Sequence, residues 1–102
     1  MQFDVHENPD PRSSDYAPYV LDVQTDLLSH LKTRAVVPLI LQDRMTAAQC
    51  LNPTFKIGKH RVVMATAELA AIRLAEIGPH VVSLDEQRAE IIGALDFLIT
   101  GI

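Results

Sequence analysis

The longest stretch of unbroken helical periodicity lies at the C-terminal end of the sequence, over residues 84–102. Ser83 precedes it and Glu86 follows three positions later, which is the spacing of a capping box at a helix start. At about 100° per residue, one face of this helix collects six apolar side chains: Leu84, Ile91, Ile92, Leu95, Leu98 and Ile99. We predict that this face covers a sheet. The other face, which holds Phe97, is predicted to dock a partner.

Alternating apolar and polar positions ahead of the helix predict several short strands: residues 2–6, 19–28, 34–41, 54–57, 60–64 and 80–82. The dipeptide Gly58-Lys59 separates two of these strands and is typical of a β-hairpin turn. Pro38 cannot donate a ladder hydrogen bond, so an edge or a bulge is expected at that point of strand 34–41. Strands followed by one helix predict an all-β or α+β domain in which the helix closes one face.

Four further segments connect these elements. Residues 7–18 are rich in Asn, Asp, Ser and Pro and predict an exposed loop, and residues 28–33 predict a turn or loop. Residues 42–50 are compatible with one or two helical turns. Residues 65–76 are ambiguous, but their content of Ala, Leu and Glu favours a helix.

Composition narrows the possible classes of protein. A length of 102 residues predicts one domain, residues 1–102, and the net charge of −4 argues against broad, non-specific binding of nucleic acid. The single cysteine, Cys50, excludes an internal disulfide and fits a reducing cytoplasm. We interpret Cys50 as a small, partly buried side chain rather than a nucleophile. The start of the chain lacks the pattern of a signal peptide, and no apolar run is long enough to span a membrane.

No catalytic residue, metal site or cofactor site is predicted from the residues themselves. The four histidines lack the spacing of metal ligands, and the glycines are too scattered for a phosphate-binding loop. Asp22 and Asp26 would share one face of a strand about 13 Å apart, too far for a coupled acid–base pair. We expect both carboxylates to be solvated or to bind a loop. Arg12 near Thr25 remains a possible pair for phosphoryl transfer in RNA cleavage.

Five collinear segments resemble the CcdB family of toxins from bacterial toxin–antitoxin modules. They are the opening M-Q-F-D-V (1–5), D-V-Q-T-D-L-L (22–28), R-A-V-V-P-L (34–39), M-A-T (64–66) with Ala70 and Gly78, and the closing A-L-D-F (94–97) with Gly101-Ile102. The resemblance implies a mainly β fold, namely a small Src-homology-3-like barrel with an extra antiparallel sheet and a C-terminal α-helix.

The resemblance also implies how the protein acts. Toxins of this family are homodimers that bind the A subunit of DNA gyrase and trap the complex in which DNA is cleaved. They are not enzymes. A cognate antitoxin neutralises the toxin, and operator DNA is bound only together with that antitoxin. Two alternatives stay open: a divergent member that keeps the dimer and antitoxin binding but poisons gyrase weakly, and an endoribonuclease of the MazF type that would use Arg12 and Thr25.

Matching the family motifs position by position gives a gyrase-facing surface on this chain: Gln2, Phe3, Thr25, Leu27, Asp96, Gly101 and Ile102. Thr100 stands where well-known members carry Trp, an aromatic anchor of a kind that contributes about 2–4 kcal/mol to an interface. Gly93 lies one helical turn before Phe97 and leaves room over that turn. Phe97 therefore either supplies the aromatic surface that Thr100 lacks or packs against a strand or a dimer partner.

Overall fold

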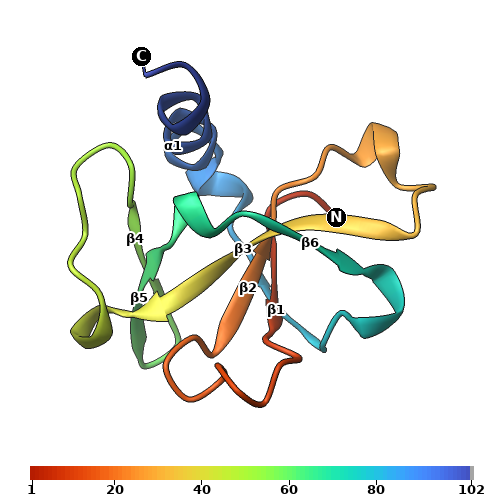
Figure 1. The fold of residues 1–102 in the computed structure, drawn as a ribbon, viewed down its shortest axis with the longest axis horizontal. Helices are drawn as coiled ribbons and strands as arrows, with labels where there is room; N and C mark the ends of the chain where they lie inside the picture. Colours follow the sequence, from red (N-terminus) through yellow and green to blue (C-terminus); the bar gives the residue numbers. More distant parts are fainter. Residues whose placement is uncertain (102) are drawn as a thin grey trace.

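The computed structural model, which describes residues 1–101, is a curled antiparallel half-barrel of strands with one α-helix at its C-terminal end (Figure 1). The seven strands are β1 (Asp4–Glu7), β2 (Tyr19–Asp22), β3 (Thr33–Leu41), β4 (Thr54–Ile57), β5 (His60–Met64), β6 (Ala70–Arg73) and β7 (His80–Ser83). The helix α1 spans Arg88–Thr100. Short 3-10 turns are η1 (Asp26–Leu28), η2 (Gln42–Arg44), η3 (Thr66–Glu68), η4 (Leu74–Glu76) and η5 (Asp85–Gln87). The predicted mainly β fold with a C-terminal helix is confirmed.

The long strand β3 organises the sheet, whose order is β4-β5-β3-β2-β1-β7 with β6 added beside β3. On one side β3 pairs with β2 throughout. On the other side, its first half pairs with β6 and its last three residues pair with β5. Pro38 lies between those two partners, where its missing N–H interrupts no ladder, and its carbonyl accepts a hydrogen bond from the Ala65 amide at 3.0 Å. The expectation of an irregularity at Pro38 is confirmed.

Helix α1 covers the core, but with a narrower face than predicted. Ile91 and Ala94 are fully buried among core residues of β1 to β5, and Leu95 packs against the same cluster. Ile92 and Ile99 are exposed, which corrects their assignment to the covered face. The buried stripe follows positions i, i+3, i+4 and i+7 from Ile91, and Ile92 and Ile99 fall outside that arc.

The start of α1 also differs from the prediction. The Ser83 hydroxyl accepts a hydrogen bond from the Asp85 amide at 3.2 Å, as expected of a capping residue. The first turn, η5, is a 3-10 helix, however, and regular α-helix begins only at Arg88. Such tightened first turns are frequent at helix ends.

The helix favoured for residues 65–76 is wrong, whereas one of the one or two helical turns predicted within residues 42–50 is present as η2. Residues 70–73, expected to be helical, form strand β6 because the first half of β3 offers an unpaired edge that β5 does not cover. In residues 42–50, only η2 is helical. Cys50 ends this connection with φ of 70° and an exposed side chain, so it is not partly buried as predicted.

The predicted β-hairpin between β4 and β5 is confirmed. Gly58 and Lys59 form its two-residue turn, with Ile57 opposite His60. Gly58 has φ of 58°, and Lys59 is not among the residues with positive φ. A positive φ at the first central position is typical of type II′ hairpin turns, which favour Gly there.

The burial of Ile91 predicts a large difference between two isoleucines of the same helix. Ile91→Ala leaves a cavity under α1 and is expected to lower the free energy of unfolding by about 2–5 kcal/mol. Ile99→Ala, at a side chain that is 74% exposed, is expected to change it by less than about 0.5 kcal/mol. Urea unfolding of both variants measures the difference, and equal midpoints would contradict the position of the helix.

Candidate protein-interaction site

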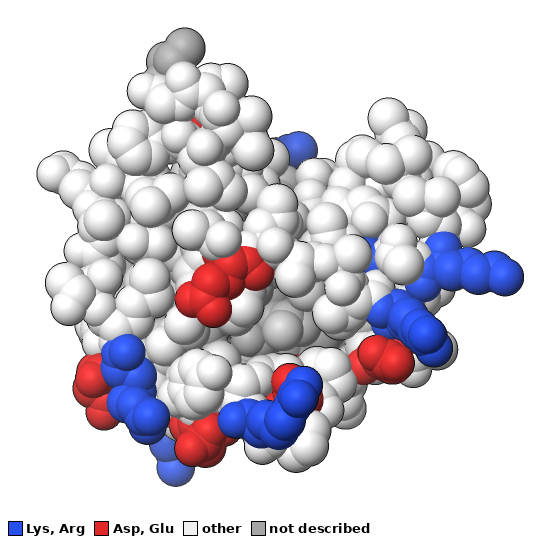
Figure 2. Space-filling view, viewed as in Figure 1, with Lys and Arg blue, Asp and Glu red and all other residues white. Residues whose placement is uncertain are grey.

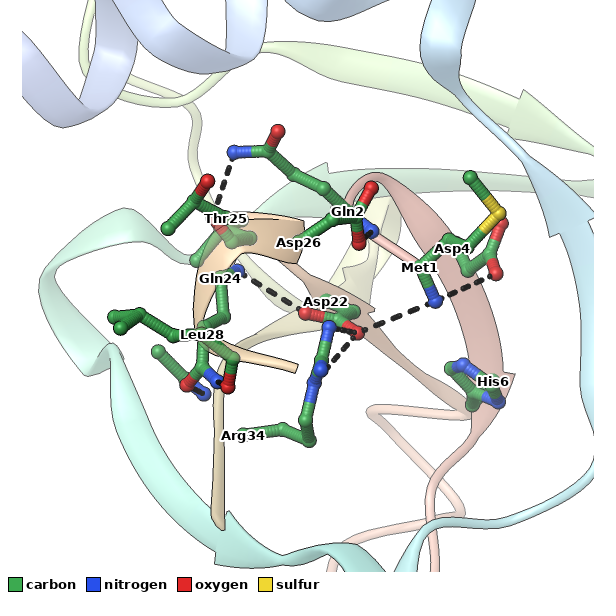
Figure 3. Close-up of polar contacts among 12 residues, drawn as sticks. Met1, Gln2, Asp4, His6, Asp22, Gln24, Thr25, Asp26, Leu28 and Arg34 are labelled. Carbon is green, nitrogen blue, oxygen red and sulfur yellow. Dashed lines mark hydrogen bonds and ion pairs between the residues drawn. The ribbon is translucent and has the colours of Figure 1, made fainter. Parts of the chain in front are cut away.

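A buried ion pair lies beneath the loop that carries two of the predicted site residues. Asp22, the last residue of β2, is 1% exposed, and the buried Arg34 of β3 donates to its Oδ2 from Nε at 3.0 Å and from Nη2 at 2.7 Å (Figure 3). Asp22 is therefore buried rather than solvated, while its second oxygen binds the following loop, which was the other predicted role. The ion pair can be inferred only once the strand register is known: Asp22 lies opposite Val36, and Arg34 precedes Val36 by two residues on the same face of β3.

The same carboxylate ends strand β2 and begins the loop. Oδ1 of Asp22 accepts a hydrogen bond from the Gln24 amide at 3.0 Å, which turns the chain away from the sheet. The predicted strand over residues 19–28 therefore stops at Asp22. Asp26 lies in the η1 turn, so the two carboxylates do not share a strand face.

The N-terminal turn is held against the end of β2. The Phe3 amide donates to the Asp22 carbonyl at 2.6 Å, and the Leu84 amide donates to the Phe3 carbonyl at 2.8 Å. Phe3 has φ of 71°, a conformation that costs a non-glycine residue free energy and that these two bonds maintain. Its ring is 1% exposed in the core, with the Arg88 guanidinium 5.3 Å from the ring centre. The buried ring of Phe3 fills the core, and its backbone positions the neighbouring residues of the predicted surface.

Gln2, Thr25 and Leu27 come together as one surface, here called the N-terminal patch. The Gln2 amide donates to Oδ1 of Asp26 at 2.9 Å, and the Gln2 side chain donates to the Val23 carbonyl at 3.2 Å (Figure 3). Thr25 is the N-cap of η1, and its hydroxyl accepts from the Leu27 amide at 3.3 Å. The Leu27 side chain is 87% exposed at the tip of this hydrogen-bonded loop.

The end of α1 forms a second surface, the helix-end patch, which consists of Asp96, Phe97, Thr100 and Gly101. The Thr100 hydroxyl donates to the Asp96 carbonyl at 2.7 Å and is thus bonded within the helix. Gly101 closes the helix with φ of 74°, and its amide donates to the Phe97 carbonyl at 2.9 Å. Only Gly readily adopts this C-cap conformation. Ile102, the remaining predicted site residue, lies outside the described residues.

Phe97 borders an apolar hollow between α1 and the connection that precedes β4. The hollow has a volume of about 500 Å³. It is lined by Cys50, Pro53, Glu90, Gly93, Ala94 and Phe97. A Cβ atom at Gly93 would meet nothing within 4 Å, so the room predicted over that turn is present. The ring of Phe97 is 38% exposed and therefore available to a partner.

Both patches project from the same edge of the molecule. Figure 1 shows the η1 loop and the end of α1 rising at the top of the view, with the N-terminus between them. On the face drawn in Figure 2 this upper part carries few charged side chains, whereas charged side chains gather along the lower and right margins and in one acidic group near the centre. Exposed apolar side chains such as Leu27 and Phe97 suit a protein partner, whereas nucleic acid requires a basic footprint.

The two candidates for RNA cleavage are not brought together. The loop between β1 and β2, which carries Arg12, lies at the lower margin of Figure 1, opposite the η1 loop that Thr25 caps. The Arg12 guanidinium donates to Asp10 from Nε at 3.1 Å and from Nη2 at 3.2 Å. Residues 1–101 contain no group of three possible metal ligands and no helix long and apolar enough to cross a membrane.

Comparison with known families gives one match. The family model described as CcdB protein matches residues 2–101, which include both patches in full. The match confirms the resemblance seen in the five collinear segments.

Removing the charge of Asp22 would leave Arg34 buried and unpaired. Asp22→Asn is therefore expected to lower the free energy of unfolding by about 3–5 kcal/mol. Asp15→Asn, at an exposed carboxylate, serves as the control. Adding Arg34→Met to Asp22→Asn should recover part of the loss, because no buried charge then remains. Urea unfolding of the four proteins tests this, and a double mutant no more stable than Asp22→Asn would contradict it.

Hydrogen bonds from the Arg12 guanidinium hold the pKa of Asp10 below its usual value of 3.8. Arg12→Gln is expected to raise the pKa of the Asp10 carboxyl, because the cation and its hydrogen bonds are lost. A lowered folded-state pKa means that any associated stabilisation is present above the unfolded pKa and is lost as the pH falls. An NMR titration of the Asp10 side chain measures the shift; identical curves for both proteins would show that the two groups do not pair in solution.

Proposed function

The chain belongs to the CcdB family and is thus a toxin of a toxin–antitoxin module, and we propose that it binds the A subunit of DNA gyrase and traps the complex in which DNA is cleaved. The observation that carries the proposal is the N-terminal patch. Leu27 is the most exposed of the large apolar side chains described, yet its loop is fixed by two hydrogen bonds, one from the Gln2 amide to Asp26 and one from the Leu27 amide to the Thr25 hydroxyl. A rigid, exposed apolar anchor lowers the entropic cost of binding a protein.

Phe97 supplies the aromatic contact of this interface. Thr100 presents no ring, and its hydroxyl is bonded to the helix backbone. The half-exposed ring of Phe97 borders an apolar hollow one turn earlier on the same helix, where Gly93 leaves open space. An aromatic side chain beside such a hollow has the features of an interface hot spot.

A homodimer completes the surface. Each protomer exposes its two patches at one edge, and further apolar side chains, including Leu74 and Ile99, are exposed as well. Pairing of two protomers would cover part of this apolar area and combine their patches into one larger surface. A cognate antitoxin neutralises the toxin in the cytoplasm, and operator DNA is bound by the complex rather than by the acidic toxin alone. Action is by protein binding, without catalysis.

Binding to purified gyrase tests the proposal. Leu27→Ala and Phe97→Ala are each expected to weaken binding to gyrase A by about tenfold or more, a loss of about 1.4 kcal/mol. Val81→Ala in β7, at a side chain as exposed as Phe97 (38%), is the matched control and should change the affinity less than about twofold. Biolayer interferometry measures the affinities, and a supercoiling assay scores the cleaved complexes.

Three outcomes contradict the proposal. Antitoxin binding without any cleaved complex would make the chain a divergent member that no longer poisons gyrase. Cleavage of RNA by the purified protein would identify an endoribonuclease. Toxicity that persists in cells whose gyrase is altered at the toxin site would point to another target.

A further inference from the structure

The β4–β5 hairpin concentrates positive charge in an acidic protein. Three of the nine Lys and Arg residues, Lys56, Lys59 and Arg61, lie within six positions beside His60, although the net charge is −4. All four side chains are exposed. Together with Leu41, Gln42 and Asp43 they line an open hollow of about 600 Å³.

Two of these cations oppose each other across the hairpin. Lys56 and Arg61 are direct partners in the register of β4 and β5, which places their Cβ atoms about 4.5–5.5 Å apart. Like charges at such positions destabilise a sheet. Within residues 1–101, no ion pair joins Lys56, Lys59 or Arg61 to a carboxylate, whereas other arginines, such as Arg12 and Arg34, have carboxylate partners.

The fold itself does not require these cations. The turn depends on Gly58, and the buried side chains of the hairpin are Phe55, Ile57, Val62, Val63 and Met64. A cluster that opposes local stability and that no internal contact compensates is expected to serve binding. The hairpin turn lies at the lower margin of Figure 1, opposite the end that carries both patches, so it is accessible when they are occupied.

We propose that the β4–β5 hairpin binds an extended acidic segment of a partner protein. The cations attract carboxylates, and charge-assisted contacts to carboxylates are strong and short. The segment is extended because β4 ends the sheet and pairs only with β5, which leaves an edge for strand addition. A nucleic acid fits less well, because it requires a broad basic footprint and the chain outside this cluster has an excess of acidic residues. This proposal is independent of gyrase binding.

A charge-matched pair of variants tests the site. The probe is a fluorescein-labelled peptide of alternating Thr and Glu, and fluorescence anisotropy at low ionic strength measures its affinity. One variant carries Lys56→Gln, Lys59→Gln and Arg61→Gln. The control loses the same net charge elsewhere through Arg12→Gln, Lys32→Gln and Arg73→Gln. The hairpin variant is expected to bind the probe about tenfold or more weakly, and the control less than about threefold.

A variant with reversed charges distinguishes a specific loss of binding from misfolding, because only a folded hairpin can gain binding to a peptide of the opposite charge. The variant Lys56→Glu, Lys59→Glu and Arg61→Glu should instead bind a peptide of alternating Thr and Lys, which the parent does not bind. The Lys56→Gln variant should also unfold at a higher temperature than the parent, because the cross-strand repulsion is relieved. Equal loss in both Gln variants, no gain in the charge swap, or tighter hairpin-dependent binding of a thymidine oligonucleotide than of the acidic peptide would each overturn the proposal.

Discussion

One buried carboxylate fixes the part of the molecule that we propose faces a partner. Asp22 accepts hydrogen bonds from Arg34 on one oxygen and from the Gln24 amide on the other, and its carbonyl accepts from Phe3. It thereby joins β3, the η1 loop and the N-terminal turn at one point. Because an unpaired buried charge costs far more than a pair contributes, movement of any of these segments would be strongly opposed. The exposed Leu27 thus rests on an ion pair that the sequence pattern alone does not predict.

The sequence predicts those features that depend on a residue's own backbone conformation or on its near neighbours. The hairpin followed from Gly58 and the irregular position from Pro38, because each residue acts on its own backbone. Residues 70–73 form a strand because they pair with the first half of β3, which is distant in the sequence. The hydrogen bonds of this pairing outweigh their helical propensity. The buried ion pair of Asp22 was missed for the same reason, because its counter-ion, Arg34, lies on the following strand.

The candidate site was predicted unevenly. Family motifs pointed to Gln2, Thr25 and Leu27, and the structure brings all three into one hydrogen-bonded surface. A motif identifies the positions of a surface but does not say whether a residue contributes through its side chain or through its backbone. Phe3 illustrates the difference, because its ring fills the core while its strained backbone holds the turn. The cationic hairpin belongs to none of the matched motifs, and its like-charge pair appears only when strand register is known.

The pairing of β1 with β7 links the two ends of the chain. The Leu84 amide is one of the two hydrogen-bonding groups that hold Phe3, and it directly follows the last strand. During translation, the N-terminal turn therefore stays incomplete until most of the protein has been made. Fraying of β7 would release the Leu84 amide from the Phe3 carbonyl and loosen the N-terminal turn. The order of the proposed N-terminal patch thus depends on a strand more than fifty residues away in the sequence.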